Sequence, residues 1–179
     1  FQAVAPTRIA DYLDKQEQQI RNNKKTFQEI LPELEKLKNS KSNEETEMFI
    51  GDKGLKTAYE LLTKDDTKEI LFFYLHEKSY YEKSEEFYQK TWPMIKERKI
   101  KARGISNEEY RNTSLVKKAP RNIQQKYVSF PVPGNIDIGK DKVLITSLKN
   151  KPIGILIHSE EIAENFRRYF ESVWKIAKS

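Results

Sequence analysis

The feature of this sequence that most constrains its fold is a repeat of apolar positions over residues 7–37. Positions with alternating spacings of four and three carry apolar or permissive residues for four heptads, between flanks rich in Lys, Glu, Gln and Asn. This repeat is typical of a coiled coil, because it keeps one face of a helix against a partner helix. We therefore expect a long helix from Thr7 to Leu37 that joins two copies of the chain. The predicted seam consists of Ile9, Leu13, Gln16, Ile20, Asn23, Phe27, Ile30, Leu34 and Leu37.

The polar residues of this helix refine the coiled-coil prediction. Gln16 and Asn23 lie on the seam, where a buried amide lowers the stability of a coiled coil but fixes its register and number of helices. Pro32 should kink the helix or restart it near Leu31, because proline lacks a backbone donor. A helix of about 30 residues spans ~45 Å, which exceeds what one small domain needs for its own packing. The alternative is a helix that folds back on its own domain.

A polar stretch after this helix, KNSKSNEET, is typical of a linker and indicates a domain boundary. Residues 1–40 are then the linker and dimerisation helix, and residues 41–179 form a second domain. Strands that first alternate with helices and then follow one another indicate an α/β fold with a mixed sheet covered by helices on both faces. Strands are expected at 48–51, 69–75, 100–106, 127–131, 135–138, 143–148 and 153–158, and helices at 54–63, 84–95, after 107 and at 159–179.

Side chains that can cap helices mark three of the expected helix starts. Ser84 and Ser159 are each followed by two glutamates, and Asn107 is the expected cap of a short helix. Pro93 falls inside the second of these helices and should bend it. The last helix has one apolar face. It consists of Ile162, Phe166, Tyr169, Phe170, Val173, Trp174 and Ala177.

The composition excludes several classes of site. The 179 residues include no cysteine, which excludes disulfides and thiolate metal sites and fits a reducing, cytoplasmic location. No apolar run approaches the roughly 18–20 residues that span a membrane. The sequence contains no H-x-x-x-H, no H-E-x-x-H and no Walker loop, so we expect neither a metal nor another cofactor. Because it begins at Phe1 rather than Met, we expect a fragment or a trimmed chain.

Basic residues are concentrated in residues 96–126. This segment has ten Lys or Arg against three Glu, a net charge of +7, whereas the whole chain carries +6. Such a patch can attract nucleic acid or an anionic ligand, and the alternative is a solvated loop. Tyr110 is the one aromatic residue between Ile100 and Lys126, so the stacking platform of a single-strand binder is missing.

Two histidines, His76 and His158, end predicted strands, and ligands of α/β proteins usually bind at strand ends. His76 begins a His-x-Lys spacing, but position 83 is Lys where a His-x-Lys-x4-Asp motif needs Asp. We therefore expect no catalytic residue. Arg103 could bind a carboxylate or phosphate through two parallel hydrogen bonds. The predicted lining of a ligand pocket at the strand ends is Tyr74, His76, Arg103, Ser147 and His158.

Four stretches resemble, in their order and spacing, the TrmB-like transcriptional regulators. They are FQAVAP (1–6), ILPELEKL (30–37), MFIGDKGLKTAYELL (48–62) and KVLITSLKNKPIGILIHSEEIAENFRRYFESVWKIA (142–177). In that family a winged helix-turn-helix domain precedes a coiled-coil helix and a phospholipase D-like effector domain without the catalytic motif. The resemblance implies a phospholipase D-like fold for residues 41–179, a homodimer and a small-molecule effector. It also implies DNA binding only through a winged helix domain, which these 179 residues do not contain.

The place of the phospholipase D motif decides whether the resemblance extends to catalysis. Residues 131–135 read PVPGN and include neither His nor Lys. Without a histidine nucleophile there, the phosphohistidine intermediate of phospholipase D enzymes cannot form. Three alternatives stay open: a scaffold domain without a ligand, an enzyme that processes phosphodiesters at another site, and direct nucleic-acid binding through residues 96–126.

Overall fold

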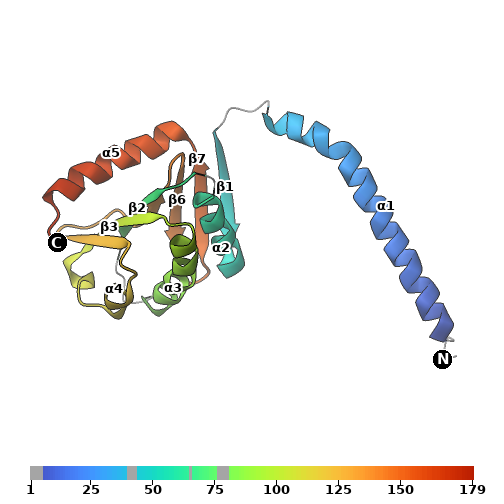
Figure 1. Ribbon diagram of the computed structural model, residues 1–179, viewed down its shortest axis with the longest axis horizontal. Coiled ribbons are helices and arrows are strands. Elements are labelled where there is room, and N and C mark those ends of the chain that lie inside the picture. The colour runs from blue at the N-terminus through green and yellow to red at the C-terminus, as the bar shows by residue number, and fades with distance from the viewer. Residues whose placement is uncertain (1–5, 40–43, 65, 76–80) are drawn as a thin grey trace. The chain divides into compact units, whose positions relative to one another are not determined.

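The computed structural model describes residues 6–39, 44–64, 66–75 and 81–179 (Figure 1). The chain separates into two compact units, Phe1–Asn43 and Glu44–Ser179. The first contains one long helix. The second contains a sheet with helices on both of its faces.

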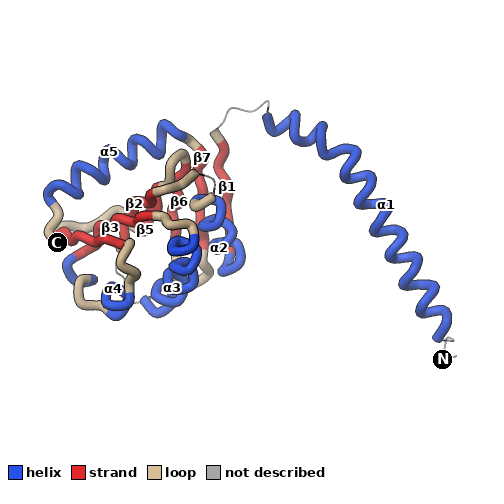
Figure 2. The backbone as a smooth tube through the Cα atoms, in the orientation of Figure 1, coloured by secondary structure: helices blue, strands red, loops and turns tan. Residues whose placement is uncertain are grey.

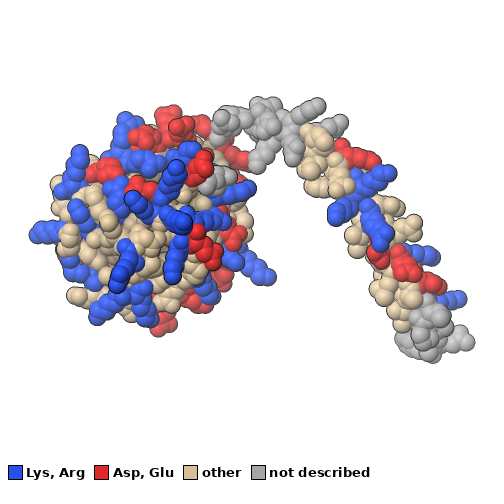
Figure 3. All heavy atoms as spheres, in the orientation of Figure 1, with Lys and Arg blue, Asp and Glu red and all other residues tan. Residues whose placement is uncertain are grey.

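Helix α1 runs from Pro6 to Asn39 as one continuous α-helix, and Pro32 lies inside it. Of the two outcomes expected at Pro32, a kink or a restart near Leu31, the restart does not occur. Proline removes one hydrogen bond, that to the carbonyl of Gln28. Gln28 is exposed, so water can bind this carbonyl and the helix can continue. Lys, Arg, Asp and Glu side chains are interspersed along α1 (Figure 3).

The side chains of α1 are described for residues 8–32, and all of them are exposed. Five large apolar residues of the predicted seam, Ile9, Leu13, Ile20, Phe27 and Ile30, are between 44% and 63% exposed. Gln16 and Asn23 are exposed on the same face. Leu34 and Leu37 belong to the helix, but their side chains lie outside the described residues.

The second unit is built on a seven-stranded sheet with the order β1-β7-β6-β5-β2-β3-β4. Strands β2, β3 and β4 are parallel, whereas β5, β6, β7 and β1 add to β2 as successive antiparallel partners. The predicted mixed sheet is thereby confirmed. Its strands are β1 (Glu45–Ile50), β2 (Glu69–Tyr74), β3 (Lys101–Asn107), β4 (Ile123–Val128), β5 (Asn135–Ile138), β6 (Lys142–Ser147) and β7 (Ile153–His158).

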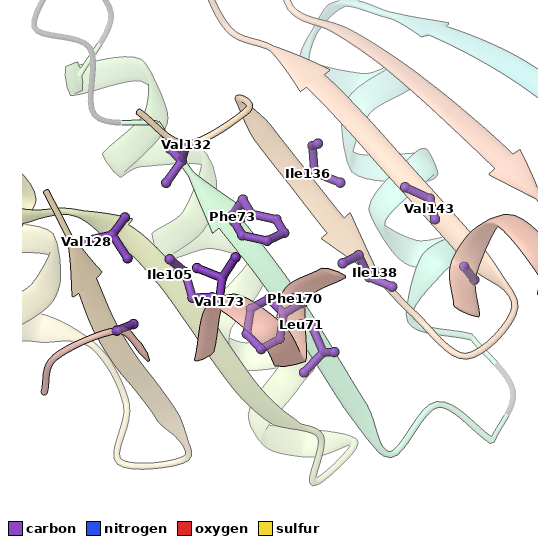
Figure 4. Packing of buried hydrophobic residues seen from close by; sticks show 12 residues of the cluster. Leu71, Phe73, Ile105, Val128, Val132, Ile136, Ile138, Val143, Phe170 and Val173 are labelled. Atoms are coloured by element: carbon purple, nitrogen blue, oxygen red, sulfur yellow. The ribbon is translucent and has the colours of Figure 1, made fainter. Parts of the chain in front are cut away.

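Helices cover the two faces of this sheet unequally (Figures 1 and 2). One face carries α2 (Gly51–Leu62), α3 (Tyr81–Glu97), the 3-10 helix η2 (Glu108–Tyr110) and α4 (Ser114–Lys118). The other face carries α5 (Glu160–Ile176) alone. Figure 4 shows the core under α5, where Phe170 and Val173 meet residues such as Phe73 and Ile105.

Helix α5 follows the sequence-based expectation closely. Ser159 is its N-cap, and the side chain of Ser159 accepts a hydrogen bond of 3.3 Å from the backbone N–H of Ile162. The apolar face is confirmed where it meets the sheet, since Phe170 and Val173 are buried. Tyr169, on the border of this face, is half exposed.

Two other local predictions are wrong, and a third holds only for the position of the residue. Ser84 is buried inside α3 rather than capping it, because the helix begins at Tyr81. Asn107 is the N-cap residue of the short helix η2 as predicted, but its side chain makes no capping hydrogen bond. Strand β4 begins at Ile123, four residues before the predicted start. Its polar residues 124–126 concealed it, because an edge strand need not be apolar.

Candidate functional site

A row of polar side chains crosses the centre of the sheet on the face that α3 covers. Thr146, Asn135, Tyr74 and Ser106 come from β6, β5, β2 and β3. Thr146 lies opposite Asn135 and Tyr74 lies opposite Ser106, while the pairing of Phe73 with Ile136 places Tyr74 beside Asn135. The row lies at the carboxyl ends of β2 and β3, the edge at which open α/β sheets usually bind ligands.

The strand register explains why these residues face α3. Successive side chains of a strand point to opposite faces of the sheet. Phe73, Ile105 and Ile136 pack in the core under α5. Their neighbours in the polar row therefore point to the other face, where Tyr74 packs against Tyr88 of α3.

All four side chains of the row are buried, but they are not equally satisfied. The Asn135 Oδ1 accepts a hydrogen bond of 2.9 Å from the backbone N–H of Leu75. The Ser106 Oγ and Thr146 Oγ1 are buried without a hydrogen-bond partner among the described residues. Leaving a buried hydroxyl unpaired costs about 1–3 kcal/mol. The row therefore has hydrogen-bonding capacity that the described part of the fold does not use.

Asp137 occupies the next position along β5 on the same face, between Leu144 and Phe72 of the neighbouring strands. It is 3% exposed, and burial raises the pKa of its carboxyl to about 7. No Lys, Arg or His within the described ranges forms an ion pair with Asp137. An isolated carboxylate is costly to bury, so the group takes up a proton instead.

Asp137 lines a cavity of about 30 Å³ between the sheet and α3. Cavities of about 10–15 Å³ hold one water, so this one has room for about two. A Cβ at position 104 would lie 2.0 Å from the Phe72 ring, so Gly104 allows this ring to lie along the cavity. Gln125 is the other polar residue of the wall, and the aromatic residues are Tyr59, Phe72, Tyr74, Tyr88, Trp92 and Tyr110.

Three tyrosines of this wall, Tyr59, Tyr88 and Tyr110, hold their protons more tightly than usual. Burial raises the pKa of Tyr59, Tyr88 and Tyr110 above the ordinary value, and the Asp137 carboxylate raises those of Tyr59 and Tyr88 further. The rings pack closely, with 4.4 Å between the ring centroids of Tyr74 and Tyr110. The site thus combines one carboxyl group with aromatic ring surface.

Of the residues predicted to line a ligand pocket, Tyr74 lies in this cavity and Arg103 does not. Arg103 points to the opposite face of the sheet, where its Nε is 2.9 Å from Glu69 Oε1 and its Nη1 is 3.2 Å from Glu171 Oε2. The same guanidinium stacks on the Trp174 ring at 5.3 Å. Its paired hydrogen bonds go to carboxylates of the protein, so Arg103 fastens α5 to the sheet.

The other predicted pocket residues do not join Tyr74 either. Ser147 is exposed and pairs with Ile153, whereas His158 pairs with Lys142 at the opposite ends of the same two strands. The His158 Nε2 lies 3.0 Å from Glu47 Oε1 on the edge strand β1. His76 lies outside the described residues.

Sequence reasoning missed Asp137, Ser106, Asn135 and Thr146. One signal was available for Asp137, because it is the charged residue of the short strand Asn-Ile-Asp-Ile, all four residues of which are buried. A carboxylate in such a strand needs a partner or a raised pKa. The other three carried no local signal, since their proximity depends on the pairing of four strands.

Part of the basic segment forms an open groove elsewhere on the sheet unit. Lys96, Lys99, Lys101 and Arg121 line it together with Asn122. This groove is the place at which residues 96–126 could meet a polyanion. Within the described residues there is no group of three or more His, Cys, Asp or Glu that could hold a metal ion. Nor does that part of the chain contain a helix with the length and apolarity to cross a membrane.

Comparisons with known proteins agree with this architecture. No protein-family model and no curated protein matches the chain. Nuc from Salmonella typhimurium, a phospholipase D family member, is 13% identical with a TM-score of 0.56 over 75% of this chain and 97% of its own. NucT from Helicobacter pylori is 13% identical with a TM-score of 0.52, over 76% and 99%. TrmBL2, an archaeal chromatin protein, is 18% identical with a TM-score of 0.47, over 99% and 72%. The first two likenesses confirm the phospholipase D-like fold.

Proposed function

We propose that this chain is the dimerisation and effector-sensing region of a transcription regulator of the TrmB-like kind, without catalytic activity. Helix α1 joins two copies of the chain, and the sheet unit binds a small molecule. DNA is contacted by a winged helix domain outside these 179 residues. The observation that carries this proposal is the exposed apolar seam of α1, with Leu13 and Ile20 60% and 63% exposed.

Physical chemistry favours a partner for this seam. Fully burying one large aliphatic or aromatic side chain is worth about 1.5–3 kcal/mol, and five such residues are exposed at heptad spacing on one helix. A lone helix in water is only marginally stable, because helices in proteins draw most of their stability from packing. Pairing with a second α1 supplies that packing. The exposed amides of Gln16 and Asn23 would then set the register.

The sensing role rests on the sheet unit. On one face of its sheet it buries an aromatic cavity, together with a carboxyl group and two hydroxyls that have no partner among the described residues. Groups of this kind gain free energy when a ligand satisfies them. A ligand that binds one arrangement of the dimer better than another shifts DNA affinity by that difference in affinity.

The absence of catalysis is part of the proposal, and the placement of the described groups supports it. His158 lies on β7, whereas Ser106 lies on β3, four strand spacings away. At about 4.8 Å per spacing this is ~19 Å, far beyond the reach of a base toward its nucleophile. A test for the enzyme alternative is hydrolysis of a generic phosphodiester by the wild type that disappears in the His76→Ala, His158→Ala double variant.

Sedimentation equilibrium of seam variants tests dimerisation. We expect the wild type to sediment at twice the chain mass and Leu13→Asp with Ile20→Asp to sediment at the chain mass, because two carboxylates cannot be buried in the seam. Circular dichroism should show the sheet unit still folded. The matched control is Gln18→Asp with Asn22→Asp, which adds the same charge outside the seam and should remain dimeric. A wild-type chain that is monomeric at every concentration would sink the proposal.

A further inference from the structure

We propose that the cavity beneath α3 binds a small organic cation, a protonated amine of about two non-hydrogen atoms, with Asp137 as its counter-ion. Aromatic rings of Tyr59, Tyr88 and Trp92 would form the surrounding wall. This inference names the chemical class of the effector and in that respect rests on the proposed function. Its test is independent of the dimer.

The charge of the site selects a cation. Asp137 is buried, and no basic side chain in the described ranges pairs with it. A buried charge is tolerated when a counter-charge accompanies it. A bound ammonium group would supply that counter-charge, whereas an anion would be repelled by the carboxylate.

The aromatic wall selects an organic cation in particular. Six aromatic residues line the cavity, and the faces of Trp, Tyr and Phe rings attract cations placed within about 6 Å of their centroids. The remaining polar groups of the wall are the tyrosine hydroxyls, the indole N–H of Trp92 and the amide of Gln125. The carbon atoms of an organic cation would make van der Waals contacts with the rings. A bare metal ion has no such atoms.

The size of the cavity limits the ligand. A cavity of about 30 Å³ has room for about two waters, and methylammonium, with one carbon and one nitrogen, occupies a similar space. A ligand gains at most about 1.5 kcal/mol per non-hydrogen atom, so two such atoms give a dissociation constant of several millimolar or weaker. Tetramethylammonium, with five such atoms, should bind more weakly because it does not fit.

Binding should depend on pH in a defined direction. The titratable and polar groups that line the cavity with Asp137 include Tyr59 of α2, Tyr88 of α3, Tyr74 of β2, Tyr110 of η2 and Gln125 of β4. None of them titrates near neutrality as an unperturbed side chain, and burial raises the pKa of Tyr59, Tyr88 and Tyr110. Asp137 has a pKa of about 7, so a cation must displace its proton below that pH. Affinity should therefore rise up to tenfold per pH unit below about pH 7 and level off above it.

Thermal unfolding of the full chain with methylammonium chloride tests this. We expect the Tm at pH 8 to rise with methylammonium over tens of millimolar and to rise less at pH 5.5. The controls are sodium chloride, sodium acetate and tetramethylammonium chloride at the same concentrations. Calorimetry in two buffers of different ionisation enthalpy should show a proton released on binding at pH 6.5.

Variants make the test specific to the site. Asp137→Asn keeps the shape of the side chain and should weaken methylammonium binding at least tenfold, whereas the exposed Asp66→Asn should leave it unchanged. Tyr88→Leu, which removes a ring of the wall, should weaken it severalfold. Equal binding by Asp137→Asn, or no methylammonium effect beyond that of sodium chloride at pH 8, overturns the inference. Sedimentation of the same samples measures dimerisation separately. A dimer that does not bind amines contradicts this inference alone. A monomer that binds them contradicts the proposed dimer alone.

Discussion

Helix α1 and the face of the sheet beneath α3 both depart, in opposite ways, from the rule that folded proteins bury apolar side chains and expose polar ones. In α1, large apolar residues such as Leu13 and Ile20 are exposed. Beneath α3, Ser106 and Asp137 are polar and buried. Folded proteins usually place such residues the other way round, so both exceptions are informative. We propose a macromolecular partner for the exposed apolar seam and a small-molecule partner for the buried polar groups.

The largest effect expected beneath α3 is a dependence of stability on pH. The pKa of Asp137 is about 7 in the folded chain against 3.8 ordinarily. Between pH 3.8 and about pH 7, folding is therefore accompanied by uptake of a proton on the Asp137 carboxyl. Its contribution to stability is therefore complete below about pH 4 and is lost as pH rises through 7, a change of about 4 kcal/mol at most. Urea unfolding of wild type and Asp137→Asn at pH 5 and pH 8 measures this. The wild type should lose more stability than the variant, with Asp66→Asn as the control, and parallel losses in all three would show that Asp137 is not the group.

A smaller effect is expected on the opposite face, where Arg103 holds α5. Arg103→Ala leaves Glu69 and Glu171 without their cation and removes the stacking on Trp174. We expect a loss of about 2 kcal/mol, since charge-assisted hydrogen bonds are strong but these three groups are partly exposed. Arg103→Lys should recover only part of it, because lysine cannot form the paired hydrogen bonds. Chemical denaturation measures both variants, and a loss below about 0.5 kcal/mol in Arg103→Ala would mean that α5 is held by its apolar face alone.

The smallest expected effect concerns the buried hydroxyls of Ser106 and Thr146, which have no hydrogen-bond partner among the described residues. Thr146→Val keeps the shape of the side chain and removes a buried polar atom. In the absence of ligand we expect this change to stabilise the sheet unit by about 1 kcal/mol. Thr113→Val is the control, because the Thr113 Oγ1 donates a hydrogen bond of 2.9 Å to the Tyr110 carbonyl and its loss should destabilise. If Thr146→Val destabilises as much as the control, the hydroxyl is satisfied in solution.

The comparison also explains what could be predicted from the sequence. The long helix, the mixed sheet and the cap at Ser159 depend on periodicity or on neighbouring residues, and they were found. The start of strand β4 was predicted too late in the sequence, because its residues 124–126 are polar, as an edge strand allows. Most of the polar row was not found, because Ser106 and Thr146 come to lie in one row only after four strands have paired. Arg103 was wrongly predicted to line a pocket, because the sequence does not show that Glu171, 68 residues away, pairs with it.

Helix pairing can be measured most directly by cross-linking, since the chain contains no cysteine and any disulfide must come from an introduced one. Two copies of Gln16→Cys should face each other across a parallel, in-register seam, within the Cα separation of about 4.4–6.8 Å that disulfides need. Under mild oxidation we expect Gln16→Cys to form a covalent dimer rapidly, and Gln18→Cys, on the outer face, to form little. Equal and slow cross-linking of both variants would contradict the account, because α1 would then have no specific partner.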